Sequence, residues 1–270
     1  MHRYPLAYTS GQCLDEWSVP APMRGVILSM RPWRRTWRGG LLVLCLAMFL
    51  AAGGVTVSAE HWAAVVGSLR GKVVAIDPGH GGIDPGAISG NGLTEDAVNL
   101  AVSQDLAALL ERSGATAILT RQGGSDSVGT TDAGPSERKR IDLRQRVEQI
   151  NLMGADVVVS IHANKFSDST QRGSQTFYNP LRFQESQLLA TMVQQQLQAI
   201  TKETGRTASD QIDHYLLNHT NMPGITVELG FLSNARDAEL LANPKYQQRL
   251  AYAIFVGLAQ YFAREARDAE

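Results

Sequence analysis

Short apolar runs alternate with longer segments of helical periodicity from Gly71 onward. The runs predicted as strands are Lys72–Asp77, Ala115–Thr120, Asp156–Ile161, Gly173–Tyr178, His214–Leu217 and Ile225–Glu228. The segments predicted as helices run from Thr94 to Arg112, from Ser136 to Met153 and from Gln184 to Glu203, followed by a short helix capped by Asn234 and a longer one opened by Pro244. This order predicts a three-layer α/β fold, in which helices cover both faces of a mixed or mostly parallel sheet of about six strands.

The first 59 residues differ from this pattern and are not expected to belong to the same domain. A basic cluster at residues 31–38 precedes an apolar stretch at residues 41–57, and small residues follow up to Ala59. That order is typical of an export signal. The apolar stretch is at the short limit for a membrane span, so cleavage near Ala59 and retention as a membrane anchor are both open. Either way, the positive-inside rule places a single catalytic domain, expected over residues 70–266, outside the cytoplasm, in the cell wall or at the outer face of the membrane.

Composition and missing motifs exclude several classes of function. The formal net charge of -1 provides no electrostatic argument for a nucleic-acid partner. Both cysteines, Cys13 and Cys45, precede the expected domain, which therefore has neither a disulfide nor a thiol nucleophile. The chain has no G-x-S-x-G motif of a serine hydrolase, and no glycine-rich phosphate-binding motif.

Polar side chains follow three of the predicted strands. His80 and His162 each lie among small residues directly after an apolar run, and Glu228 ends a third run. Ligands of open α/β sheets bind beyond the carboxyl ends of the strands, where these groups would converge. Catalytic zinc sites use three protein ligands, so His80 and His162 could supply two and a nearby carboxylate the third. Glu95, in the first turn of the helix after His80, is the best candidate, and Asn99 on the same helix face could orient it.

Glu228 remains as an ionisable group beside this predicted metal site. A carboxylate that is not a ligand could take a proton from an attacking water and return it to a leaving nitrogen, as metal-assisted hydrolysis requires. Asp77 and Asp84 are alternative ligands, although Asp before Pro is also a common turn residue.

Two further groups have competing interpretations. His214 and His219 are expected at the surface, with a position in the cleft as the alternative for His214. The charged run Glu137–Arg140 is expected to be a solvated helix face, with contact to an anionic substrate or partner as the alternative.

The chain resembles the zinc-dependent N-acetylmuramoyl-L-alanine amidases of the amidase 3 family over roughly Lys72 to Phe262. The motifs that carry the resemblance are Val74–Gly82, Glu95 with Asn99, Ser160–Asn164 and Val227–Asn234. The resemblance implies Zn²⁺ held by His80, Glu95 and His162, with Glu228 catalytic. It also implies peptidoglycan as the substrate, cleaved at the amide between the lactyl group of N-acetylmuramic acid and the L-alanine of the stem peptide.

Ser136–Val147 and the compact C-terminal half are similar to the germination-specific amidases of endospore formers. That similarity implies a role in spore cortex maturation through muramic δ-lactam, with the space between the forespore and mother cell membranes as the site of action. A vegetative cell-wall autolysin, a zinc peptidase and an inactive peptidoglycan-binding homologue are the alternatives.

Two absences bear on control and localisation. Only Lys165–Arg172 separates the second histidine motif from the next predicted strand, too short a stretch for the inhibitory helix of some family members. The chain has no wall-binding repeats, so localisation is expected to depend on the export segment or on a protein partner, which could also be regulatory.

Overall fold

The computed structural model of the chain describes residues 59–129, 131–202 and 205–269. The predicted export signal or anchor at residues 31–57 lies outside these residues. Within the described part, no helix combines the length and the apolar character needed to cross a membrane.

A six-stranded mixed sheet forms the centre of the fold. Its strands are β1 (Val73–Pro78), β2 (Thr116–Leu119), β3 (Val157–Asn164), β4 (Gln175–Tyr178), β5 (Ser209–Asp210) and β6 (Gly224–Phe231). They lie in the order β2-β1-β3-β6-β4-β5, with β2, β1, β3 and β6 parallel and β4 antiparallel to β6. The predicted α/β class with a mixed sheet is confirmed.

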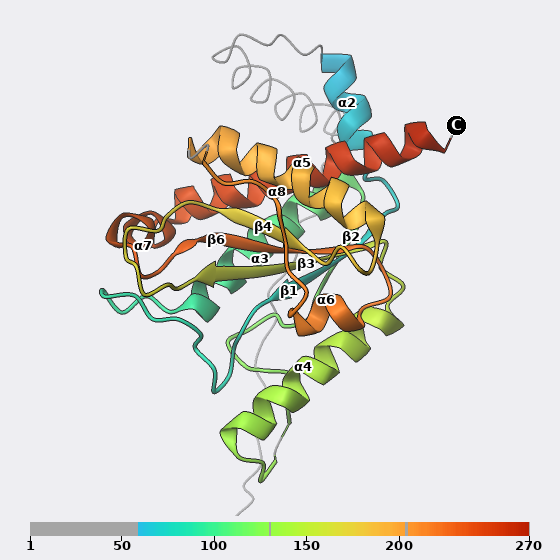
Figure 1. The fold of residues 1–270 in the computed structure, drawn as a ribbon. Helices are drawn as coiled ribbons and strands as arrows, with labels where there is room; N and C mark the ends of the chain where they lie inside the picture. The colour runs from blue at the N-terminus through green and yellow to red at the C-terminus, as the bar shows by residue number, and fades with distance from the viewer. Residues whose placement is uncertain (1–58, 130, 203–204, 270) are drawn as a thin grey trace, which may run out of the picture. The chain divides into compact units, whose positions relative to one another are not determined.

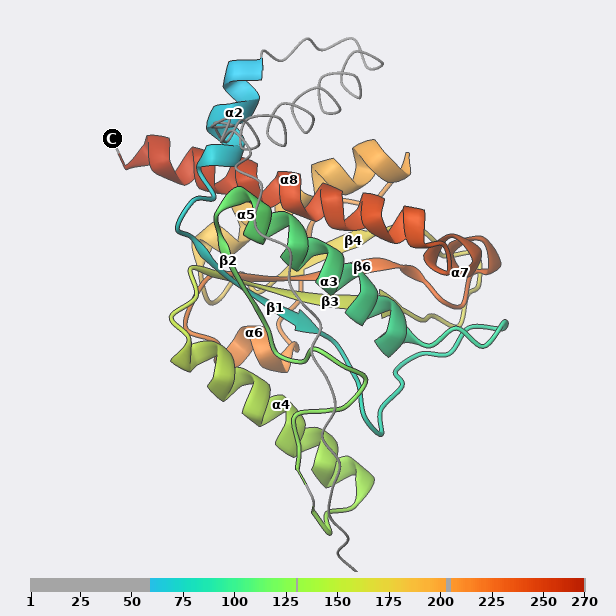
Figure 2. The same ribbon diagram turned by 180° about the vertical axis from the view of Figure 1, so that it is seen from behind.

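Helices cover both faces of the sheet (Figures 1 and 2). On one face lie α3 (Glu95–Ser113), α5 (Gln184–Thr201) and α8 (Pro244–Asp268), with α2 (Ala59–Gly67) packed against α8. On the other face lie α4 (Pro135–Leu152) and the short α6 (Tyr215–His219). The remaining helix, α7 (Ala235–Leu241), follows β6 and is capped by the predicted Asn234, whose side chain accepts hydrogen bonds from two backbone N–H groups.

The two faces bury cores of unequal size. Alternate residues of a strand point to opposite faces, so Val74 and Ile76 enter the larger core beneath α3 and α8, whereas Ala75 enters the smaller core beneath α4 and α6. Burial on both faces explains why the strands read as continuous apolar runs. The smaller core leaves room for polar side chains on its face of the sheet.

Two local predictions are wrong. His214–Leu217 is not a strand: α6 begins at Tyr215, and the edge strand β5 is Ser209–Asp210. Leu216 and Leu217 are consecutive and both enter the smaller core, which a helix permits but an alternating strand does not. Ser136 does not cap α4; Gly134 occupies the N-cap position and Pro135 the first turn, where the missing N–H of proline costs nothing.

Candidate active site

The parallel pairing of β1 and β3 brings His80 and His162 to the same edge of the sheet. Pro78 lies opposite Ile161 in the register, so both histidines follow the same row, and their ring centroids are 5.1 Å apart. His80 has a φ of 62°, in the left-handed region that few non-glycine residues adopt. At Gly79 an added Cβ would lie 2.3 Å from Cε1 of His162, so only glycine allows this close approach.

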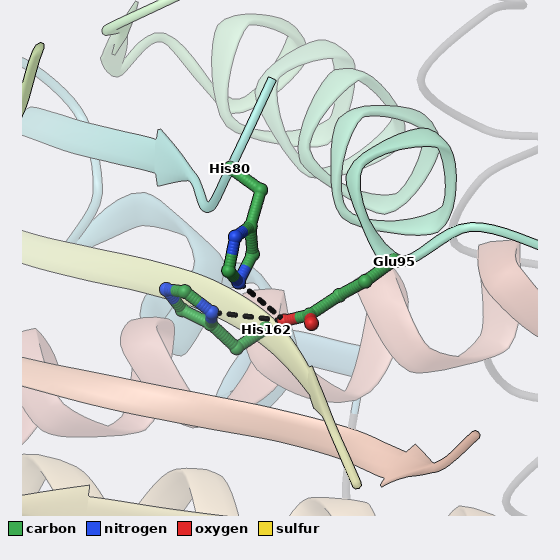
Figure 3. Close-up of side chains that lie close together, drawn as sticks. All are labelled: His80, Glu95 and His162. Atoms are coloured by element: carbon green, nitrogen blue, oxygen red, sulfur yellow. Dashed lines mark hydrogen bonds and ion pairs between the residues drawn. The ribbon is translucent and has the colours of Figure 1, made fainter. Parts of the chain in front are cut away.

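Glu95 extends from the first residue of α3 to a position between the two imidazoles. Its Oε1 lies 3.1 Å from Nε2 of His80 and 3.0 Å from Nδ1 of His162 (Figure 3). The backbone N–H of Ala163 donates to the same oxygen at 3.1 Å, and the N–H of Ala87 donates to Oε2 at 2.8 Å. Asn99 donates to Gly79 O at 3.2 Å and so ties α3 to the loop that carries His80.

This trio is a group of residues that could hold a metal ion. One potential ligand atom from each of His80, Glu95 and His162 lies within 4.8 Å of the others. Asp77 and Asp84, the alternative ligands, do not belong to the group. Two imidazoles and a carboxylate form the donor set of known catalytic zinc sites. Asp84 Oδ2 lies 3.0 Å from His80 Nδ1, the kind of outer carboxylate that orients a metal-binding imidazole through its other nitrogen.

The electrostatics of the trio keep its carboxylate ionised. Burial alone raises the pKa of Glu95, but hydrogen bonds and charge from His162 and His80 outweigh it and lower that pKa. Burial likewise lowers the pKa of His80, but Glu95 and then Asp84 raise it to about 9. The ionised carboxylate is stabilised by positive charge beside it, which a proton on His80 or a divalent metal ion can provide.

Two arginines fix the backbone of the loop that presents His80. The buried guanidinium of Arg146 donates to Pro78 O at 2.7 Å and to His80 O at 2.6 Å. Arg121 donates to Pro78 O at 2.9 Å and to Gly79 O at 3.0 Å. Three successive carbonyl oxygens are therefore held by guanidinium groups, which supports the left-handed conformation of His80.

Asp77 helps to hold this loop in place. Its carboxylate accepts hydrogen bonds from Arg146 at 3.0 Å, Thr120 at 2.7 Å and Ser160 at 2.9 Å. Burial would raise the pKa of Asp77, but the charge of Arg146 and the bond from Thr120 keep it below its ordinary value. Asp77 therefore balances the charge of a buried arginine.

Glu228 lies next to the trio on β6. It pairs in register with His162 of β3, so both side chains point to the same face of the sheet. The residue is half-buried, but its Oε2 is buried and has no hydrogen-bond partner among the described residues. Burial raises the pKa of Glu228; His162 opposes this rise and Glu95 adds to it, and the result is about 7. Such a group can both accept and return a proton near neutral pH.

A cavity of about 320 Å³ opens beside the trio, between the loop after β1, α4 and the start of α6. His80 and His162 line it together with His214, which takes the cleft position left open by the sequence. Burial and the nearby His162 lower the pKa of His214 to about 4. His219 instead stacks on Tyr215 and is not among the lining residues.

Sequence reasoning missed several residues around this cavity. Lys139, expected on a solvated helix face, lines the cavity and forms an ion pair with Asp84 at 2.8 Å. Arg146 and Arg121 were not predicted at all. The burial of Arg146 could have been predicted, because it precedes Ile150 by four residues and therefore shares the predicted apolar face of α4.

Several proteins that this chain resembles are named as N-acetylmuramoyl-L-alanine amidases. A family model described as N-acetylmuramoyl-L-alanine amidase matches residues 74–260. The germination-specific N-acetylmuramoyl-L-alanine amidase of Bacillus subtilis (strain 168) is 38% identical over 202 residues, which cover 75% of this chain and 84% of that protein. The amidase LytC of the same organism is 35% identical over 196 residues, covering 71% of this chain and 36% of LytC.

A solved structure agrees with these sequence matches. The CwlD amidase from Clostridioides difficile, in complex with the GerS lipoprotein, has a TM-score of 0.68 and 36% identity. The alignment covers 70% of this chain and 98% of that one. The family match includes β3, β6 and all but the first residue of β1, and it also contains the trio and Glu228. These matches show that the chain belongs to the amidase 3 family and is a hydrolase of the N-acetylmuramoyl-L-alanine amidase class.

Proposed function

We propose that His80, Glu95 and His162 hold Zn²⁺ and that Glu228 is the catalytic proton-transfer group for cleavage of the lactyl–L-alanine amide of peptidoglycan. The observation that carries this proposal is the approach of two imidazole nitrogens to Glu95 Oε1 beside the unpartnered Oε2 of Glu228. Bound zinc would supply Lewis-acid polarisation of the carbonyl and a lower pKa for the attacking water.

The residues of the chain supply the remaining steps. Glu228 accepts a proton from water as the oxygen bonds to the amide carbon, and then delivers that proton to the nitrogen as the carbon–nitrogen bond breaks. Its pKa of about 7 suits both transfers. Asp84 and Asn99 keep His80 and Glu95 oriented while this happens.

A role in spore cortex maturation is the biological setting that the similarities favour. The relative at 38% identity is named as germination-specific, and the structural neighbour is a CwlD amidase bound to a lipoprotein. We therefore also propose a regulatory protein partner and action outside the cytoplasm, with residues 1–59 as the export signal or membrane anchor and residues 70–266 as the catalytic domain. A vegetative cell-wall amidase is the second candidate, because LytC is 35% identical.

Digestion of purified peptidoglycan tests the chemistry. We expect the zinc-loaded protein to release stem peptides and to leave a free lactyl carboxylate on the sugar, as read by mass spectrometry. A chelator should stop the reaction and Zn²⁺ should restore it. Shortened stem peptides would instead identify a peptidase, and wall binding without any product would identify an inactive homologue.

Deletion of the gene in its host tests the setting. Cortex from the deletion strain should lose muramic δ-lactam, and complementation with the Glu228→Gln variant should not restore it. Unchanged lactam content together with a defect in the vegetative wall would support the second candidate.

A further inference from the structure

His214 lines the cavity beside the trio, but the roles proposed for the trio and Glu228 do not involve it. It precedes the first residue of α6 as the N-cap, but its side chain does not cap the helix. Its ring stands edge-on to the ring of His162, with centroids 5.9 Å apart. A polar group held beside His162 therefore also lies beside the imidazole of His214.

The nitrogens of His214 have no partner within the described chain. No hydrogen bond to a described residue involves either of them, and Nδ1 is buried. Leaving a buried polar atom unpaired costs about 1–3 kcal/mol, so such an atom calls for an explanation. Nδ1 is closed to a ligand, but the half-buried ring lines the cavity, so a substrate bound there can reach the imidazole through Nε2. The tautomer with its hydrogen on Nε2, and the protonated ring, can donate an N–H to such a substrate.

The proposed reaction creates a need for such a donor. When the water oxygen bonds to the amide carbon, the electron pair of the carbonyl double bond moves to the carbonyl oxygen and makes it negative. That charge persists until the carbon–nitrogen bond breaks and the nitrogen takes the proton from Glu228. A fixed N–H donor aimed at this oxygen stabilises the transition state more than the ground state.

We propose that His214 is a catalytic residue that donates a hydrogen bond to the oxygen of the scissile carbonyl. This inference rests on the proposed function and adds a second source of stabilisation, from α6 rather than from the metal. It also assigns α6 the task of presenting the donor, since Leu216 and Leu217 anchor the helix in the smaller core.

Three variants of the full-length protein test the assignment. His214→Phe keeps a ring against His162 but removes the donor, and His214→Gln keeps an N–H donor without the ring. His219→Phe is the matched control, because it changes the histidine at the other end of α6, which does not line the cavity. Each protein is loaded with Zn²⁺, its metal content and thermal midpoint are measured, and kcat and KM are determined on peptidoglycan fragments.

We expect His214→Phe to lower kcat about 100-fold with KM within about twofold, the size typical of losing one oxyanion donor. His214→Gln should recover at least about tenfold of this loss, and metal content should stay at the level of the unchanged protein. If Phe disturbs the fold, His214→Met compared with His214→Gln makes the same test.

Three results would overturn the proposal: an unchanged kcat in His214→Phe, a raised KM alone, or loss of zinc from the variant. Inactivity of the zinc-loaded, unchanged protein would contradict the proposed function itself, so the two failures are distinguishable.

Discussion

Replacing Glu228 with Gln is expected to abolish hydrolysis and, at the same time, to stabilise the metal-free protein at alkaline pH. The pKa of Glu228 rises from an ordinary 4.5 to about 7 because of burial, and its buried Oε2 has no hydrogen-bond donor among the described residues. Between these two pH values the folded state binds more protons than the unfolded state. The free energy of unfolding therefore falls as pH rises through this window, and the full penalty is present above pH 7.

The size of the penalty follows from the two pKa values. A rise from 4.5 to about 7 corresponds to about 3 kcal/mol at pH 8. Gln does not ionise and so avoids this cost. Its buried NH₂ group would also lack a partner, however, which destabilises the variant by about 1 kcal/mol. We expect the variant to be about 2 kcal/mol more stable at pH 8, and no more stable than the unchanged protein at pH 4.5.

Urea denaturation of both proteins after chelator treatment measures this difference. The curves should separate progressively between pH 4.5 and 8, whereas activity after zinc loading should be lost in the variant at every pH. Glu148→Gln, which changes an exposed carboxylate on α4, is the control for the general effect of removing a negative charge. A stability difference that does not change with pH would refute the assignment of a buried, unpaired carboxylate to Glu228.

Three other predictions concern the His80 loop and the metal site. Arg146→Met should lower the free energy of unfolding, measured by urea denaturation, by about 3–5 kcal/mol, because it leaves the carboxylate of Asp77 buried without its charged partner. A decrease below about 1 kcal/mol would contradict the pairing of Arg146 with Asp77. Zinc affinity should rise about tenfold for each pH unit between 6 and 8, because His80, with a pKa of about 9 in the metal-free site, must lose a proton to bind the metal. Calorimetry in two buffers should detect the released proton, and an affinity that does not change with pH would refute the prediction. Gly79→Ala should lower zinc affinity at least about tenfold, because its Cβ would meet the ring of His162 at 2.3 Å, whereas Gly90→Ala, where an added Cβ meets nothing within 4 Å, should leave the affinity unchanged.

The alternation of strands and helices was predictable because both faces of the parallel strands are buried, which produces apolar runs that periodicity detects. The edge position of His80 and His162 followed from the same pattern, since each histidine directly follows such a run. The short α6 was misread because a five-residue helix is too brief to display its own period.

The supporting residues of the site were harder to predict, because their roles depend on contacts between distant parts of the chain. Arg146 shares the apolar face of α4, and nothing nearby in the sequence indicates that Asp77, 69 positions away, neutralises it. The unpaired atoms of Glu228 and His214 are likewise properties of the folded packing, since a pattern of residue types does not show which polar atoms lack partners.

The pairing of His162 with Glu228 on adjacent strands has a consequence for how such an enzyme can be controlled. Neighbouring strands are held about 4.8 Å apart by their hydrogen bonds, so Glu228, the proposed proton-transfer group, and His162 cannot separate unless the centre of the sheet opens. A switch that pulls the catalytic groups apart would therefore cost much of the stability of the fold. Control by a partner protein is better placed at the cavity walls, α4 and α6, where a small shift changes access for a glycan strand and leaves the sheet intact.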